Sequence, residues 1–135
     1  MLPVDVARRL KEAGLRWKPA PGDRFAIPDR DLDDQVFVLS EMVIDVHHLP
    51  DGPVIGFNGT TEWALDDLEQ DEAVWLPRED QLRALLGGTF RALLHDGGSY
   101  RVETVMVDGP RSFEANDAEV AYSEALLALI RFGTV

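Results

Sequence analysis

The spacing of hydrophobic residues changes along the chain, and the clearest change lies within residues 73–86. The run AVWL at residues 73–76 is continuous and rich in strand-forming side chains, which predicts a strand with little solvent exposure. Beyond Pro77, whose ring suits the first turn of a helix, leucines recur at spacings of three and four until Gly87. These leucines are Leu82, Leu85 and Leu86. We therefore expect a strand joined directly to a helix, with Trp75 and the leucines in one core.

Apolar residues with helical spacing recur at residues 3–13 and 117–132. The first segment carries a narrow apolar stripe and precedes Gly14, which favours a helix end. The second carries a wide apolar face, with Asn116 as the expected N-cap residue and Gly133 after the last turn. The wide face consists of Ala118, Ala121, Tyr122, Ala125, Leu126, Leu129 and Ile130. We expect this C-terminal helix to cover the core.

Strand patterns fill the sequence between these helices. They lie at residues 23–27, 36–39, 42–48, 54–57, 60–65, 99–107 and 111–115. The face expected to be buried in the run at 99–107 consists of Tyr100, Val102, Thr104 and Met106. Turn signals such as Asn58-Gly59 separate neighbouring runs and favour antiparallel pairing. Residues 66–72 predict an acidic loop, and residues 89–95 predict a short helix.

Together these elements predict a single α+β domain over residues 1–135. One antiparallel sheet of about five strands would pack against the C-terminal helix and the helix begun by Pro77. A chain of this length buries roughly two-thirds of its unfolded surface, so one hydrophobic core suffices. The sequence contains no internal repeat and no linker-like segment.

Charge is the compositional feature that changes this picture most. Thirteen Lys and Arg stand against twenty-five Asp and Glu, a net charge of −12. That excess disfavours binding to nucleic-acid phosphates and to anionic membrane surfaces. It permits a basic protein partner or imitation of the charge of DNA, and solubility alone is the more common reason for such a charge.

Two absences narrow the function classes further. The sequence contains no cysteine, which excludes disulfides, thiolate metal sites and cysteine nucleophiles. Its first fifteen residues are polar and amphipathic, and no apolar run approaches the roughly 20 residues that span a bilayer. We therefore expect no membrane segment and a cytoplasmic location.

Candidate ligands for a metal are few. Asp45 and His47 lie two residues apart in a predicted strand and so share a face, whereas His48 lies on the other face. The acidic run at residues 29–34 begins like a calcium loop, but it lacks the glycine and the final glutamate of that loop. The sequence therefore predicts no metal site and no cofactor. A ligand-binding or metal-dependent site on the strand of Asp45 and His47 stays the alternative.

The tryptophans are the remaining candidates for a binding surface. An exposed Trp17 or Trp63 would indicate such a surface, whereas packing in the core is the commoner role of tryptophan. No G-x-S-x-G motif and no phosphate-binding loop occurs, so no catalytic residue is predicted. The candidate ligand or partner surface thus consists of Trp17, Trp63, Asp45 and His47.

Three segments carry a resemblance to known families. GDRFAIPDRDLDDQVFVLSEM, IGFNGTTEWALD and AVWLPREDQLRALLGGTF together resemble a family of small uncharacterised actinobacterial proteins, some of them automatically labelled as pilus assembly proteins. The resemblance covers most of the chain, roughly residues 14–129. Parts of it are also similar to small phage-associated proteins of unknown function. It implies a bacterial protein, and neither family supplies a catalytic residue.

These observations favour a small acidic interaction module without catalytic activity. It would bind another protein or a second copy of itself as a homodimer, and neither nucleic acid nor membrane. A small-ligand-binding protein or a metal-dependent enzyme that uses Asp45 and His47 is the alternative. A DNA mimic or an immunity-type inhibitor ranks below both.

Overall fold

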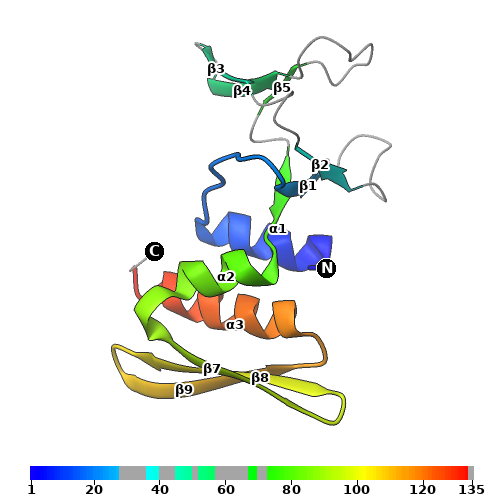
Figure 1. The fold of residues 1–135 in the computed structure, drawn as a ribbon. Coiled ribbons are helices and arrows are strands. Elements are labelled where there is room, and N and C mark those ends of the chain that lie inside the picture. Colours follow the sequence, from blue (N-terminus) through cyan, green and yellow to red (C-terminus); the bar gives the residue numbers. More distant parts are fainter. Residues whose placement is uncertain (28–35, 40–44, 50–51, 57–66, 70–72, 134–135) are drawn as a thin grey trace. The chain divides into compact units, whose positions relative to one another are not determined.

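The computed structural model has the predicted α+β fold class (Figure 1). It describes residues 1–27, 36–39, 45–49, 52–56, 67–69 and 73–133, and for residues 45–49, 52–56 and 67–69 it describes the backbone. The elements are α1 (Val4–Ala13), β1 (Arg24–Ala26), β2 (Phe37–Val38), β3 (Asp45–Leu49), β4 (Gly52–Gly56), β5 (Asp67–Glu69), β6 (Val74–Leu76), α2 (Glu79–Leu86), η2 (Gly87–Thr89), β7 (Phe90–Asp96), β8 (Ser99–Met106), β9 (Gly109–Ala115) and α3 (Ala118–Arg131).

The chain divides into two compact units. Unit 1 consists of residues 1–16 and 77–135, and unit 2 consists of residues 17–76. Unit 1 holds the three described α-helices and the strands β7, β8 and β9. Unit 2 holds strands β1 to β6. That the chain is a single domain stays a prediction.

The expected sheet of about five strands is wrong. Within the described part of the chain, the strands form three antiparallel sheets of three strands each. Their orders are β2-β1-β6, β3-β4-β5 and β7-β8-β9. A hydrophobic pattern identifies a strand but not its partner, because partners are selected by turn geometry and by which faces find cover. Here β7, β8 and β9 pair with their hairpin neighbours, whereas β1 pairs with the distant β6.

Helix α3 is the centre of unit 1. It contacts α1 and α2 as well as β8 and β9, and in Figure 1 it lies between the sheet and the other two helices. Its buried residues are Ala121, Tyr122, Ser123, Ala125, Leu126, Leu127, Ala128 and Leu129. They surround more of the helix than the one predicted face, since Leu127 and Ala128 are also buried. A helix that is apolar on nearly every side must be packed against other elements on more than one side, and α3 contacts both the sheet and the other two helices.

The N-terminus of α3 corrects a second expectation. The N-cap residue is Asp117 and not Asn116. The Oδ1 atom of Asp117 accepts hydrogen bonds from the backbone N–H groups of Glu119, at 2.8 Å, and Val120, at 3.3 Å. Both residues have side chains suited to capping, so the backbone path from β9 into α3 selects between them.

Helix α2 and the segment after it confirm one prediction and contradict another. Leu82 and Leu86 are buried and Gly87 follows the helix with φ of 57°, as predicted. Pro77, expected in the first turn, instead lies just before the N-cap residue Arg78, and α2 begins at Glu79. The predicted short helix at residues 89–95 is wrong, because that segment is the strand β7. A helix of two turns gains little by itself. A strand here closes a two-residue hairpin with β8 and gains a full ladder of hydrogen bonds.

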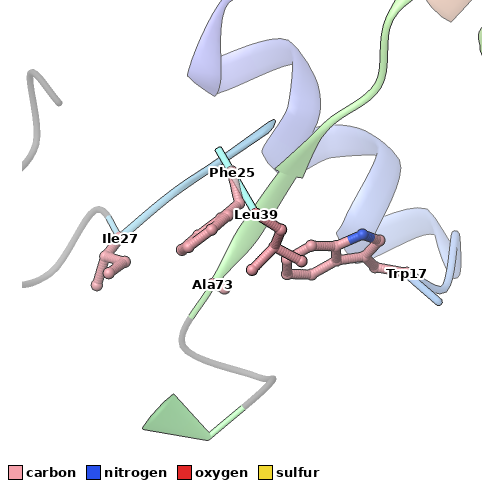
Figure 2. Packing of buried hydrophobic residues seen from close by; sticks show 5 residues of the cluster. All are labelled: Trp17, Phe25, Ile27, Leu39 and Ala73. Atoms are coloured by element: carbon pink, nitrogen blue, oxygen red, sulfur yellow. The ribbon is translucent and has the colours of Figure 1, made fainter. Parts of the chain in front are cut away.

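Unit 2 has an aromatic core. Trp17, Phe25, Ile27, Leu39 and Ala73 form a buried cluster, which Figure 2 shows around strand β1. Phe37 and Trp75 pack against it from β2 and β6. The rings of Trp17 and Phe37 each lie with their centroids 5.4 Å from that of Phe25, a distance that favours aromatic pairs. The strand predicted at 73–76 is confirmed as β6, and its Trp75 packs on this aromatic cluster.

The third sheet contains another correction. Residues 67–69, expected in an acidic loop, form strand β5, which pairs with β4. The sequence Asp-Leu-Glu alternates charged and apolar residues, and an edge strand tolerates charges on its solvent side. The predicted strand at 60–65 and the turn at Asn58-Gly59 lie outside the described residues.

Candidate protein-binding surface

Three of the four predicted site residues lie in the sequence between β2 and β6, within unit 2. Asp45 and His47 lie in β3, where they pair with Gly56 and Val54 of β4. The structure describes their backbone only, and Trp63 lies outside the described residues. Among the residues whose side chains are described, no group of three or more His, Cys, Asp or Glu could hold a metal ion. A site that uses Asp45, His47 and Trp63 therefore stays a prediction.

Trp17 has a structural role. It is 8% exposed, and its indole Nε1 donates a hydrogen bond to Oδ2 of the buried Asp23 at 2.9 Å. The same oxygen accepts from the backbone N–H of Ala20 at 3.0 Å. This carboxylate therefore folds the connector onto β1 and satisfies two donors at once. The exposure that would indicate a binding role is not found at Trp17. Sequence reasoning missed Asp23, whose only signal is its position between a Trp-containing connector and a strand.

Strand β8 alternates between a covered face and an open face. Val102, Thr104 and Met106 are buried on the face that α3 covers, as predicted. Arg101, Glu103 and Val105 alternate with them and therefore lie on the opposite face of the sheet. We call this opposite face of β7, β8 and β9 the outer face.

Antiparallel pairing arranges the outer face in rows. One row runs Leu94–Arg101–Glu114 across β7, β8 and β9. The next rows run Ala92–Glu103–Ser112 and Val105–Pro110. Most of these side chains are short or exposed, so the outer face is open, with the Arg101 row at its centre.

Electrostatics on the outer face centre on Arg101. Its Nε atom lies 3.3 Å from Glu103 Oε1, and its Nη1 atom lies 3.8 Å from Glu114 Oε1. Asp96 lies two residues after Leu94 on β7 and therefore on the same face, where it adds a third carboxylate. The rows around Arg101 thus hold one guanidinium and three carboxylates, two of which lie within 4 Å of it, so this surface carries a net negative charge. Exposed pairs of this kind each contribute about 0–1 kcal/mol to stability, so their structural value is small.

Large apolar side chains are exposed beside these charges. Leu94 and Val105 are each 39% exposed, and Val107, just beyond β8, is 82% exposed. An apolar side chain next to a charged group is a common composition of protein interfaces. The sequence does contain the signal for this surface: Val105 and Val107 occupy positions of the 99–107 run that should be polar if only solvent covered them.

The polar group buried deepest under the sheet is the phenol of Tyr122. Its ring packs against Phe90, with centroids 5.7 Å apart, and the carboxylate of Glu79 lies close to its hydroxyl. Burial, and then the negative charge of the nearby Glu79, raise the pKa of Tyr122. This group is enclosed by α2, α3 and β7 and belongs to the core rather than to the outer face.

Comparison with protein-family models, with curated proteins and with solved structures gave no match to this chain. No helix among the described residues is long and apolar enough to cross a membrane. The family resemblance stays a prediction.

Proposed function

We propose that this chain is an interaction module without catalytic activity that binds a basic protein surface through its outer face. The observation that carries the proposal is the composition of that face. Arg101 lies within 4 Å of the carboxylates of Glu103 and Glu114, Asp96 adds a third carboxylate to the face, and Leu94 and Val105 are exposed on it.

Charge complementarity supports a basic partner. A carboxylate has two oxygens with about four acceptor positions, so Glu103 and Glu114 can accept from a partner's Lys or Arg as well as from Arg101. Complementary charges speed association and orient the partner, while the apolar side chains supply burial. Val105, on the central strand, would add apolar area that the partner buries.

The distribution of charge along the chain supports the same class of partner. Unit 2 contains three Lys and Arg against fourteen Asp and Glu, so it carries −11 of the total −12. A field of this sign attracts cationic surfaces over distances of about a Debye length, roughly 8–10 Å at physiological salt. Unit 2 would therefore raise the rate of encounter, and the outer face of unit 1 would supply specific contacts.

The test begins with a photo-crosslinking amino acid in place of Ser112, an exposed residue of the outer face that pairs with Glu103. A matched chain carries it in place of Glu12, which is exposed on α1. We expect a protein crosslinked from Ser112 and not from Glu12. The crosslinked protein is then purified, and its affinity for the chain is measured by calorimetry.

Charge-neutralising variants decide whether binding uses the outer face. The double variant Glu103→Gln, Glu114→Gln should weaken binding about tenfold and reduce its salt dependence, because two interfacial charges are lost. Glu12→Gln removes a comparable exposed charge and should leave binding unchanged. Equal affinity of the double variant and the unsubstituted chain, with both folded by circular dichroism, would refute the proposal.

A further inference from the structure

Strand β7 is an edge strand with an open side. Among the described residues it pairs with β8 and with no other strand. Contacts of α3 concentrate on β8 and β9, and Leu94 of β7 is 39% exposed. An uncovered edge of this kind presents unpaired N–H and C=O groups that another strand can bind.

The turn between β7 and β8 determines which backbone groups face the open side. Asp96 pairs with Ser99 around the two-residue turn at Gly97-Gly98, and such a closing pair is hydrogen-bonded. Hydrogen-bonded and non-hydrogen-bonded pairs alternate along the ladder. Leu94 therefore bonds toward β8, whereas the N–H and C=O groups of Leu93 and His95 point to the open side.

A ring contact agrees with this assignment. His95 and Tyr100 form a pair whose rings stack with centroids 4.2 Å apart and planes within 6°. Side chains approach more closely in non-hydrogen-bonded pairs, which is the type assigned to His95 and Tyr100. No hydrogen bond of the Leu93 or His95 backbone to any other segment is found in the described part of the chain.

The two edges of this sheet differ in protection. The opposite edge, β9, contains Pro110 near its start, and proline lacks the donor that strand pairing needs. On β7 the irregular pairing between Phe90 and Ala92 disturbs only the first residues. From Ala92 to Asp96 the strand is regular and contains no proline and no lysine.

We infer that β7 pairs antiparallel with β7 of a second copy of this chain, joining two meanders into one six-stranded sheet. The two-fold axis passes beside Leu94, so that Leu94 faces Leu94 and Leu93 faces His95 of the second copy. This register pairs the open backbone groups of Leu93 with those of His95 twice, and it avoids the irregular start of β7. It also covers the exposed side chain of Leu94.

Charge supports a second copy as the occupant. The strand carries Arg91 at one end and Asp96 at the other, so antiparallel pairing brings opposite charges near each other at both ends. Unit 1 carries ten Lys and Arg against eleven Asp and Glu, so little net repulsion opposes the approach of two copies of it. This dimer does not depend on the proposed function.

A single cysteine gives the sharpest test, because the native chain has none. At the two-fold axis, the Leu94 positions form a non-hydrogen-bonded pair with Cα atoms about 4.5 Å apart, which suits a disulfide. We expect Leu94→Cys to form a covalent dimer under mild oxidation. Val105→Cys is equally exposed on the same face but lies on the central strand, so it should form no covalent dimer under the same oxidation, as judged on a non-reducing gel. Equal crosslinking of the two variants would overturn the inference.

Mass in solution provides the second measurement. Sedimentation equilibrium of the full chain should show a dimer whose fraction rises with concentration. Leu94→Lys places two like charges at the axis and should raise the dissociation constant at least tenfold, whereas Val105→Lys should not change it. A native chain that stays monomeric throughout, as it would if β7 accepted only a foreign extended segment, would overturn the inference.

The two proposals fail separately in these experiments. Val105→Lys should impair binding of a basic partner to the outer face without changing the mass in solution. Leu93→Pro removes a donor that points to the open side, and it should weaken the dimer while the β7–β8 ladder persists. Loss of the dimer with partner binding intact would leave the proposed function standing.

Discussion

Each of the two units of this chain buries one face of a small sheet, and the side chains that cover it differ between them. In unit 1 the meander is covered by α3, which is itself covered by α1 and α2. In unit 2 the sheet β2-β1-β6 is covered by an aromatic cluster and by a connector that a buried carboxylate holds in place. Unit 1 is nearly neutral, whereas unit 2 carries almost all the negative charge.

This difference indicates where each unit is vulnerable. A helix layer spreads stability over many apolar contacts, none of which is decisive. A cluster built on a few rings and one carboxylate concentrates stability in a few residues. Self-repulsion among the carboxylates of unit 2 adds to that vulnerability at low salt.

The largest effect is expected from Phe25→Ala. Phe25 is 1% exposed and contacts the rings of both Trp17 and Phe37, so its removal opens a cavity at the centre of unit 2. We expect a loss of about 4 kcal/mol in the free energy of unfolding, measured by urea titration of tryptophan fluorescence. Leu126→Ala in α3 is the matched change in unit 1. If Leu126→Ala cost more than Phe25→Ala, the contrast between a concentrated and a distributed core would be broken.

The second largest effect tests how much the buried carboxylate of Asp23 stabilises unit 2. Asp23→Ala should cost about 2 kcal/mol, because the indole N–H of Trp17 and the backbone N–H of Ala20 lose their common acceptor. Asp23→Asn keeps an acceptor oxygen and should cost clearly less. The measurement is the urea midpoint together with the Trp17 emission maximum. Equal costs for the two variants would show that the hydrogen bonds contribute little.

A smaller effect tests the start of α3. Asp117→Ala removes the side chain that accepts from two backbone N–H groups and should cost about 1 kcal/mol. Asn116→Ala is the neighbouring control, and thermal unfolding should show almost no change for it. A cost at Asn116 instead of Asp117 would restore the cap expected from sequence.

The smallest effect is a pH dependence in unit 1. Because burial raises the pKa of Tyr122, the unfolded chain ionises this phenol first as pH rises through about 10. The folded state is then left protonated, so stability decreases above about pH 10 and is unaffected below it. Tyr122→Phe should lack this decrease. The measurement compares urea midpoints of the two proteins at about pH 8 and about pH 11, where all other groups titrate alike. Parallel pH profiles would contradict the assignment.

Much of unit 1 was accessible from sequence because its signals are local. The leucine spacing in α2, the glycines after α1 and α2, and the alternation in β8 each depend on neighbouring residues alone. The β8 residues of the outer face could also be predicted from this alternation, since it places Arg101, Glu103 and Val105 on one face. The pattern could not show that this face stays uncovered, because that depends on the side of the sheet on which α3 packs.

The sequence by itself located the helices α1, α2 and α3 to within about two residues, the strand at 74–76 and an acidic charge concentrated in the middle of the chain. Tertiary structure decided that residues 90–96 pair as a strand and that β1 joins the distant β6. It also decided that Trp17 is buried and donates a hydrogen bond to Asp23. The reason is physical: helix periodicity, capping glycines and charge act within a few residues, whereas strand partners and burial depend on contacts between residues far apart in the chain.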